Sequence, residues 1–439
     1  MSPRVYIETY GCQMNVADSE LMFGVLARAG YDRVDTPDEA EVMLVNTCAV
    51  RDNAEQRVIG RVGELQRHKR PGDILGVVGC MAQRLGPVLL ERVAKVDLVV
   101  GPDAYRNLPS LLAQAGAGER LHDTEFRSWE HYEDVPPVRE AGATQFVTVQ
   151  RGCDYRCTFC IVPTTRGPER SRKLEDVVRE VRDLAAQGTT EVTLLGQTVN
   201  SWTDGTHAFG QLLRAVGTVD GIRRVRFTSP YPTDFTGEVI AAMAEVPSVC
   251  EHVHLPAQSG SDSCLKRMLR RYRRAEYLEV VARLRERIPG ITFSTDLIVG
   301  FPGETEAEFQ ETLSLVGEAG FDEAYTFKYS PRDGTPAVRM QGHVDDAVAS
   351  ERLDRLIAVV RDQSRRRNIG RVGSVHEVLV ERIAKRGEML LARTRTNQMV
   401  LLDLPESAIG EYRTVRLSGT TGSTFTGELL SGAPALAVL

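Results

Sequence analysis

Three closely spaced cysteines give the sharpest chemical signal in this sequence. Cys153, Cys157 and Cys160 lie within eight residues, directly after an apolar run at Phe146–Gln150. Three thiolates can hold three irons of a cubane [4Fe–4S] cluster and leave the fourth iron open as a reaction site. A loop zinc site is the plainer alternative, but zinc takes four tetrahedral ligands and no fourth Cys or His lies nearby. Unrelated free thiols are the other alternative.

A second set of cysteines is dispersed along the first third of the chain. Each of its members, Cys12, Cys48 and Cys80, follows one of the first three apolar runs expected to form buried parallel strands. The carboxyl ends of parallel strands share one edge of a sheet, where ligands bind, so we expect a second cluster there. The alternative is that small buried thiols end strands as core residues. We interpret Cys250 and Cys264 in that way, because they match no ligand spacing.

The elements that position these cysteines fall into three groups. Residues 1–118 alternate apolar runs with helical patterns, which predicts a doubly wound α/β domain. Its expected strands are Val5–Tyr10, Val42–Asn46, Ile74–Gly79 and Val96–Val100, and its expected helices include Asp18–Ala29 and Asn53–His68. Residues 119–144 are polar, contain Pro136-Pro137 and are interpreted as a linker.

A second alternating series covers residues 145–370. About six βα units in ~190 residues predict a partial (β/α)6 barrel, shorter than the usual eight-unit barrel of ~250 residues. Strands are expected at Phe146–Gln150, Glu191–Leu195, Arg224–Thr228, His252–Leu255, Thr292–Val299 and Glu323–Phe327. Helices are expected at Lys173–Gln187, Cys264–Arg287, Glu304–Ala319 and Asp345–Asn368.

The tail, residues 371–439, shows a different pattern: short stretches in which apolar and polar residues alternate, separated by turn residues. The five expected strands predict a small OB-like β-barrel. They lie at Val375–Glu381, Met389–Thr396, Met399–Leu404, Arg413–Ser418 and Phe425–Leu429.

Composition narrows the class of protein. The 439 residues are 42% hydrophobic and 26% charged, which excludes a disordered, collagen-like or disulfide-framework chain. No charge-free run approaches the ~18 apolar residues of a membrane span. The N-terminus lacks a basic start followed by an apolar core, so we expect a cytoplasmic protein with reduced thiols and no membrane partner. The net charge of −6 excludes a globally basic nucleic-acid binder.

The cysteine spacing at the mouth of a βα barrel resembles the radical S-adenosylmethionine (SAM) superfamily. In that superfamily SAM binds the open iron, and one electron splits it into methionine and a 5′-deoxyadenosyl radical. The resemblance implies that Phe159 packs beside the SAM adenine. Gln197 stands where many members carry the Glu of a Gly-Gly-Glu that holds the SAM amine. Ile298-Val299-Gly300 fits the adenine contact in part.

With both triads in place, the whole chain resembles the methylthiotransferases, which carry an N-terminal cluster domain, a radical SAM domain and a C-terminal TRAM domain. The segments that carry the resemblance are Tyr10-Gly-Cys-Gln-Met-Asn15, Asn46-Thr-Cys48, Gln150-Arg-Gly-Cys153, Cys160 through Arg172, Leu195-Gly-Gln-Thr-Val-Asn200 and His254-Leu-Pro-Ala-Gln-Ser-Gly-Ser261. The resemblance implies two [4Fe–4S] clusters, with Cys12, Cys48 and Cys80 as ligands of the auxiliary one. It also implies two uses of SAM, one as methyl donor and one as radical source.

The segments at Thr165–Arg172 and Gln258–Ser261 favour, by resemblance, tRNA carrying N6-isopentenyladenosine at position 37 as the substrate. The product would be the 2-methylthio derivative. A methylthiotransferase acting on threonylcarbamoyl-adenosine or on a small-subunit ribosomal protein is the nearest alternative. A non-catalytic iron–sulfur RNA-binding redox sensor is an alternative from another class. We also expect a protein electron donor and a monomer.

Basic residues provide candidates for contact with RNA. Residues 266–274 hold six Lys and Arg in nine positions, and Leu265, Met268, Leu269 and Tyr272 recur at helical spacing, which predicts one helix with a basic face. Such a run is usually a solvated face, and phosphate contact is the functional alternative. The candidates are Lys266, Arg267, Arg270 and Arg271, joined in the tail by Lys385, Arg386, Arg393 and Arg395.

Overall fold

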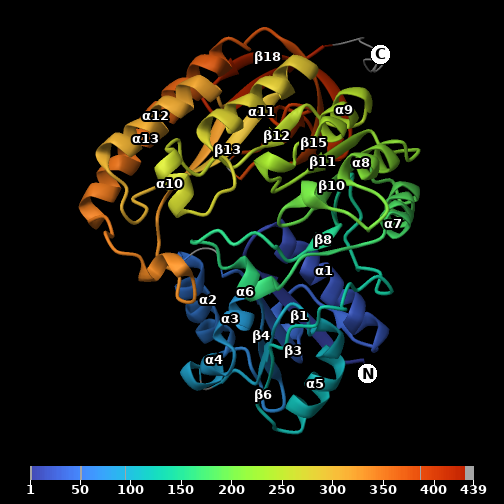
Figure 1. The fold of residues 1–439 in the computed structure, drawn as a ribbon. Helices are drawn as coiled ribbons and strands as arrows, with labels where there is room; N and C mark the ends of the chain where they lie inside the picture. The colour runs from blue at the N-terminus through green and yellow to red at the C-terminus, as the bar shows by residue number, and fades with distance from the viewer. Residues whose placement is uncertain (1, 50–51, 94, 386, 431–439) are drawn as a thin grey trace.

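The computed structural model describes residues 2–49, 52–93, 95–385 and 387–430. Figure 1 shows an N-terminal α/β unit, a central half-barrel wrapped by helices, and a small β-barrel against the far side of the half-barrel. None of the helices formed by the described residues is long and apolar enough to cross a membrane.

The N-terminal unit is a parallel sheet with helices on both faces, as expected for a doubly wound domain. Its strands lie in the order β2 (Asp32–Arg33), β1 (Arg4–Thr9), β3 (Val42–Thr47), β4 (Ile74–Gly79), β5 (Leu98–Val100) and β6 (Leu121–Asp123). One face packs on α1 (Gln13–Arg28) and α5 (Leu108–Gly116), and the other on α2 (Asp52–Leu65), α3 (Cys80–Leu85) and α4 (Pro87–Arg92). Successive strand residues alternate between the faces: Leu44 joins the first core and Val45 the second.

The edge strands β2 and β6 were not expected from the sequence. β6 lies inside the segment interpreted as a linker, yet it pairs in parallel with β5. Strands of two or three residues are too short to show a hydrophobic period, so neither could be found by pattern. The rest of that segment packs on the sheet domain, where Tyr132 and Val135 are buried in the core beside α1.

The central unit is the expected partial barrel of six parallel strands. The first sheet holds β7 (Thr144–Thr148), β10 (Glu191–Leu195) and β11 (Arg224–Phe227), and the second holds β12 (His252–His254), β13 (Thr292–Val299) and β14 (Glu323–Lys328). A bridge between Val225 and Val249 connects the two sheets, and within the described strands β7 and β14 do not pair. The helices outside are α7 (Leu174–Ala186), α8 (Phe209–Gly217), α9 (Gly237–Glu245), α11 (Arg274–Arg287), α12 (Glu306–Ala319) and α13 (Asp346–Ile369).

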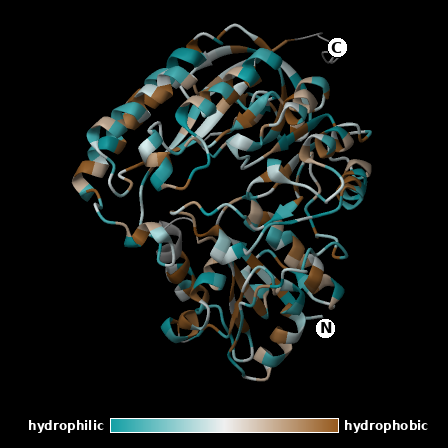
Figure 2. Cartoon of the chain, viewed as in Figure 1, coloured by the Kyte–Doolittle hydropathy of each residue, from teal (hydrophilic) through white to brown (hydrophobic). Residues whose placement is uncertain are grey.

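Residues of the barrel strands alternate between two environments. Val192, Val253 and Phe293 belong to the large apolar core shared with the helices. The intervening residues face the barrel interior and form polar pairs there, such as Arg226 with Glu191 at 3.0 Å and His254 with Asp296 at 3.2 Å. Figure 2 shows hydrophobic residues along the strands and more hydrophilic residues on the outer helices. The part of the barrel interior that these pairs line is therefore polar.

The basic run does not form the single helix expected from its spacing. It divides into α10 (Asp262–Arg267) and the start of α11, and Leu269 between them takes a left-handed φ of 55°. Leu265, Met268 and Tyr272 are buried as expected, whereas Leu269 is exposed. The helical spacing was misleading because it does not reveal the turn at Leu269. This turn points Arg270 inward, where its guanidinium donates to the Pro256 carbonyl.

The C-terminal unit is the expected five-stranded barrel. It closes in the order β15 (Val375–Ile383), β16 (Leu390–Thr394), β17 (Met399–Leu402), β19 (Thr424–Leu429) and β18 (Tyr412–Thr420). Phe425 lies at the centre of its core, fully buried among aliphatic residues of the other strands.

Buried arginines attach this small barrel to the amino ends of the half-barrel strands. Arg224 donates to the carbonyls of Arg393 and Glu377, and Arg226 donates to those of Thr394 and Arg395. The small barrel therefore closes the end of the half-barrel opposite the carboxyl ends of its strands.

Two adjacent arginines allow a test of this attachment. Arg223 and Arg224 both pair with Glu377, but Arg224 is 0% exposed and Arg223 is 41% exposed. Replacing a fully buried charged partner leaves other polar groups unpaired, so we expect Arg224→Ala to lower the free energy of unfolding by about 3–5 kcal/mol. We expect Arg223→Ala to lower it by about 1 kcal/mol or less. Urea denaturation of the full chain measures both, and equal losses would contradict the attachment.

Candidate active site

Cys12, Cys48 and Cys80 meet at one edge of the N-terminal sheet, as the sequence predicted. β1, β3 and β4 are neighbours and parallel, so the segments that leave their carboxyl ends lie side by side. Cys12 precedes α1, Cys48 follows β3, and Cys80 begins α3. Cys12 is exposed, whereas the side chains of Cys48 and Cys80 are buried.

Close packing of these three segments explains the glycines that precede two of the cysteines. A Cβ at Gly79 would lie 2.5 Å from Oδ1 of Asn46, and a Cβ at Gly11 would overlap Asn15 and Cys48. Asn46 in turn donates to the Asn15 carbonyl at 2.7 Å. The buried side-chain amides of Asn15 and Asn46, with the close backbone contacts at Gly11 and Gly79, thus hold the three segments in fixed positions relative to one another.

The second triad lies on the loop between β8 (Gln150–Arg151) and α6 (Val162–Arg166), at the carboxyl end of the first barrel strand. Cys153 and Cys157 are buried and Cys160 is partly buried. Thr158 fixes the loop, because its N–H donates to the Met268 carbonyl and its hydroxyl donates to the Arg267 carbonyl. The loop is therefore held against the segment that carries the basic residues.

The two triads face each other across the junction of the two units. Cys80 packs in one small apolar cluster with Ala49, which follows Cys48, and with Ile161, which follows Cys160. α3 contacts α6, and Figure 1 shows both helices between the sheet and the half-barrel. A reactive species generated at one triad could therefore act close to the other.

Burial and nearby charged or polar groups shift the pKa of several of these thiols. A hydrogen bond with Cys48 and the positive charge of Arg166 lower the pKa of Cys12 to about 6, although burial acts in the opposite direction. Burial raises the pKa of Cys153 to about 11 and that of Cys160 to about 12. Burial outweighs the positive charge of Arg270 near Cys160, so both thiols are protonated at neutral pH, and a metal that binds them must displace the protons.

Each triad has one sulfur that accepts a hydrogen bond from an arginine, which is buried in the case of Arg166 and partly buried in the case of Arg270. Nε of Arg166 lies 3.2 Å from Sγ of Cys80, and Nη1 of Arg270 lies 3.4 Å from Sγ of Cys157. The Arg270 guanidinium also lies 4.3 Å from the centre of the Tyr231 ring. Arg270, a candidate for contact with RNA, is therefore partly buried and donates to a cysteine.

The residues around the triads fit an iron–sulfur cluster and SAM. All six donors are thiols, the ligand type that clusters require. Oε1 of Gln197 is buried without a hydrogen-bond partner among the described residues, and could accept from an ammonium group. Phe159 and Ile298 both pack against Phe301 and its apolar neighbours, and their contact with adenine stays a prediction.

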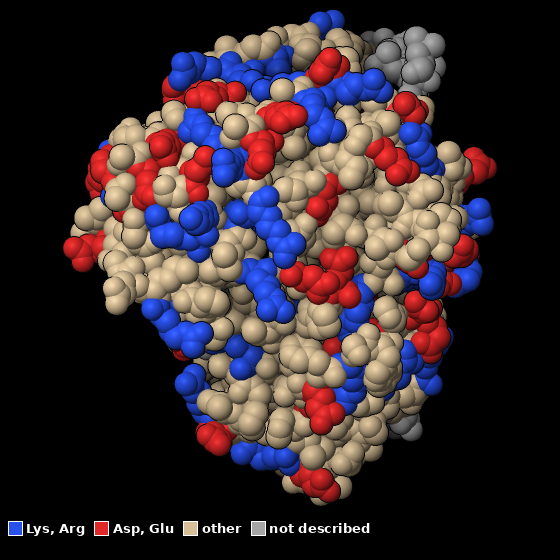
Figure 3. Space-filling view, viewed as in Figure 1, with Lys and Arg blue, Asp and Glu red and all other residues tan. Residues whose placement is uncertain are grey.

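The remaining basic candidates occupy different surroundings. Lys266, Arg271 and Lys385 are exposed, and Figure 3 shows Lys and Arg side chains gathered where α10 lies in Figure 1. Arg267 forms a two-pronged ion pair with Glu308. Arg386 lies outside the described residues.

Two candidates of the small barrel are used within the protein. Arg393 pairs with Glu381 at 2.6 Å. Arg395 pairs with Glu251 of the half-barrel and donates to the carbonyls of Pro247 and Val249. These contacts commit the Arg395 guanidinium to the attachment of the small barrel.

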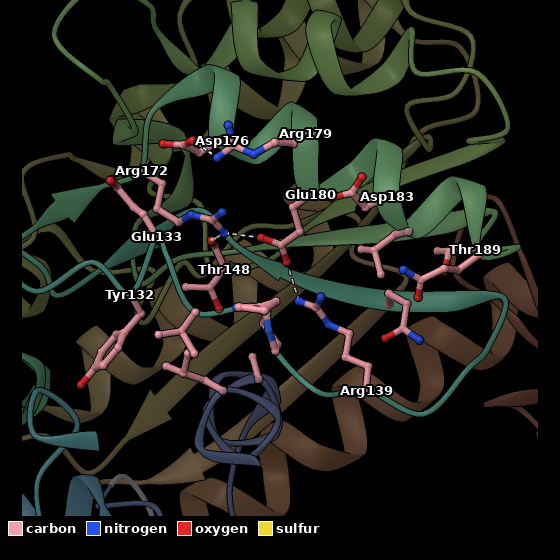
Figure 4. Close-up of a pocket in the computed structure, with 18 of the residues that line it drawn as sticks. Tyr132, Glu133, Arg139, Thr148, Arg172, Asp176, Arg179, Glu180, Asp183 and Thr189 are labelled. Atoms are coloured by element: carbon pink, nitrogen blue, oxygen red, sulfur yellow. Dashed lines mark hydrogen bonds and ion pairs between the residues drawn. The ribbon is translucent and has the colours of Figure 1, made fainter. Parts of the chain in front are cut away.

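A cavity of about 310 Å³ lies between α1, residues 131–142 and α7. Figure 4 shows Arg139 and Arg172 reaching the Glu180 carboxylate from two sides. Arg139 also pairs with Glu20 of α1, so the cavity wall ties the two units together. The described residues that line the cavity include none of the six cysteines.

Several residues around the triads were not found from the sequence. Arg166 and Glu169 lie in the Cys160–Arg172 segment that carried the family resemblance, but no local pattern indicated their contacts. Glu169 accepts hydrogen bonds from Ser201 and from Thr198, next to Gln197. Asp18 looks like an ordinary polar residue of a helix, and the sequence carries no signal that it pairs with distant arginines.

Family models cover the three units of the chain. Residues 4–101 match a model described as "Uncharacterized protein family UPF0004", residues 147–316 match the radical SAM superfamily, and residues 371–430 match the TRAM domain. The chain also resembles a solved radical S-adenosylmethionine methyltransferase, TsrM from Kitasatospora setae, with a TM-score of 0.59 and 16% identity over 77% of each chain. That likeness shows a shared fold.

Curated relatives align over almost the whole chain. A "tRNA-2-methylthio-N(6)-dimethylallyladenosine synthase" from Porphyromonas gingivalis is 45% identical over 97% of this chain and 95% of its own length. A protein of the same name from Geobacter sulfurreducens is 44% identical over 97% of both chains. The order of the three units, the two facing triads and this identity agree: the chain belongs to the tRNA-2-methylthio-N6-dimethylallyladenosine synthase family of radical SAM methylthiotransferases.

Proposed function

We propose that the chain is a tRNA methylthiotransferase that converts N6-isopentenyladenosine at position 37 into its 2-methylthio derivative. The observation that carries this proposal is the 45% identity to a synthase of that name over 97% of the chain. The two cysteine triads that face each other add structural support, because the reaction needs a radical source next to a sulfur source.

Cys153, Cys157 and Cys160 would hold the radical SAM cluster, and Cys12, Cys48 and Cys80 the auxiliary cluster. When bound, the clusters and SAM supply the radical that removes hydrogen from carbon 2 of the adenine, and the methylthio group. The protein binds these groups and keeps water away from them. Burial of Cys48, Cys80, Cys153 and Cys157 serves that purpose.

Three side chains of the half-barrel would orient SAM. Gln197 offers a buried carboxamide oxygen without a partner among the described residues, which suits the SAM ammonium group. Phe159 and Ile298 border one apolar cluster, which suits the adenine. Gln197 replaces the acidic residue of many superfamily members. The Glu169 carboxylate accepts hydrogen bonds from Thr198 and Ser201, and so brings a negative charge to the turn that follows Gln197.

The open interior of the half-barrel offers a place for the modified base. Tyr325 and Phe327 lie on one face of β14 and are 46% and 41% exposed. The Tyr325 ring contacts that of His254, which faces the interior. Phe327 pairs across the strands with Ile298, next to the proposed SAM site. An exposed aromatic surface there suits an isopentenyl group, which contributes ~0.8 kcal/mol per buried methylene.

The base would have to leave its stack to enter the barrel mouth. Lys266 and Arg271 are exposed on the segment that holds the cluster loop, so they are placed for contact with phosphates near the mouth. Lys385 lies on the small barrel at the opposite end, where it would contact a more distant part of the tRNA. We also propose a protein electron donor and a monomeric enzyme.

We predict that anaerobically reconstituted protein carries about eight irons, as two cubane clusters. Replacing Cys12, Cys48 and Cys80 together by alanine should lower the content to about four, because the second triad remains. Chemical iron analysis with Mössbauer spectroscopy measures both values. A maximum near four irons in the unmodified chain would contradict the second cluster.

The triads should also separate functionally. Cys157→Ala should abolish formation of 5′-deoxyadenosine, because the radical SAM cluster loses a ligand. Cys48→Ala should retain SAM cleavage but yield no methylthiolated product, because only the auxiliary triad is damaged. Chromatography of the reaction products measures each, and equal loss of SAM cleavage in the two folded variants would refute the assignment.

The substrate is tested with two anticodon stem-loops that differ only in the isopentenyl group, under single-turnover anaerobic conditions. We expect methylthiolation of the isopentenyl loop alone. Phe327→Ala should lower kcat/KM for that loop by roughly tenfold or more, because it removes apolar contact surface.

Trp129→Ala is the matched control, because Trp129 is a highly exposed aromatic residue outside the half-barrel. It should leave kcat/KM unchanged. Comparable reaction of the unmodified loop, or preference for a threonylcarbamoyl loop, would overturn the proposed substrate.

A further inference from the structure

Arg166 reaches from the half-barrel unit into the cysteine triad of the N-terminal unit. Its Nε lies 3.2 Å from Sγ of Cys80, and its positive charge also acts on Cys12. Its Nη1 is buried and has no hydrogen-bond partner among the described residues, which leaves both N–H groups of Nη1 for a bound group. A side chain from another domain thus forms part of the immediate surroundings of the N-terminal triad.

A buried carboxylate holds Arg166 in this position. Oδ2 of Asp18 lies 2.7 Å from Nη2 of Arg166, and Oδ1 of Asp18 lies 2.9 Å from Nη1 of Arg151. Asp18 is fully buried. Burial raises the pKa of its carboxyl group, but the two arginines outweigh this effect and hold the pKa below the ordinary value. Arg151 lies two residues before Cys153, so the network links the segments that carry both triads.

A second ion pair across the same junction provides an internal comparison. Arg170 forms two hydrogen bonds to Asp103, at 3.0 and 2.8 Å, and both side chains are buried. The other contacts of the Arg170 guanidinium are with the carbonyl oxygens of Arg127, Glu130 and Arg166, and it donates to no sulfur of the described cysteines. Arg166 and Arg170 therefore serve the same junction, but Arg166 alone of these two contacts a cysteine.

We propose that Arg166 is a positioning residue of the auxiliary cluster, which holds the Cys80 thiolate and raises the reduction potential of that cluster. This inference rests on the proposed role of Cys80 as a ligand. A cluster gains negative charge on reduction, so a fixed positive charge and a donated hydrogen bond at its sulfur stabilise the reduced form more than the oxidised form. Removal of the guanidinium shifts the potential to more negative values.

The experiment uses the full chain with Cys153, Cys157 and Cys160 replaced by alanine, so that the signal comes from the auxiliary cluster. Redox titration followed by electron paramagnetic resonance gives its potential. For Arg166→Gln we expect the ratio of reduced to oxidised cluster at the unmodified midpoint to fall about tenfold, a shift of about 59 mV for one electron. Arg166→Lys keeps the charge without the planar fork, and should recover part of the shift.

Arg170→Gln is the matched control. It breaks a buried ion pair at the same junction, so it should lower stability as Arg166→Gln does, but leave the potential unchanged. If Arg166→Gln alone loses its iron, with an unchanged circular dichroism spectrum, that loss supports the same role through retention of the cluster.

Two outcomes overturn the inference by itself: a normal iron content with an unchanged potential in Arg166→Gln, or equal shifts in Arg166→Gln and Arg170→Gln, which would indicate a structural role. Absence of iron from the background chain with Arg166 intact is a different result. It would overturn the auxiliary cluster of the proposed function, and this inference with it.

Discussion

Two buried carboxylates of the N-terminal sheet domain, Asp18 and Asp103, hold the two cysteine triads against each other. Each is paired with arginine from the segment that surrounds the cluster loop, and both lie out of contact with water. A buried charge without its partner is strongly unfavourable, so these pairs define one docking geometry between the sheet and the half-barrel. The facing triads depend on that geometry, because none of the described strands crosses the junction.

The parallel sheets explain why the triads can meet at all. In both units the cysteines follow the carboxyl ends of parallel strands, where the chain leaves the sheet and backbone groups are free to bind ligands. When two such edges face each other, the sites they carry lie close together. The small C-terminal barrel attaches through Arg224 and Arg226 to the other end of the strands, and so leaves the mouth open for substrate.

Arginine has three distinct structural roles in this molecule, although the sequence does not distinguish the arginines that perform them. Arg166 and Arg270 donate to cysteine sulfurs, Arg224 and Arg395 attach the small barrel, and Arg271 is exposed near the mouth. The planar guanidinium can donate several hydrogen bonds at once, so it suits sites where a carbonyl, a carboxylate or a sulfur must be held in a fixed direction.

The sequence by itself determined the order of the three units, most strands to within two residues, and both triads. Those features depend on local spacing: apolar runs, glycines before Cys12 and Cys80, and three cysteines within one loop. The tertiary structure decided which charged residues serve the site. Asp18 and Arg151 are 133 positions apart, and the turn at Leu269 alone sends Arg270 inward. Local periodicity reports how residues share a face, whereas the partner of a buried charge is chosen by the packing of distant segments.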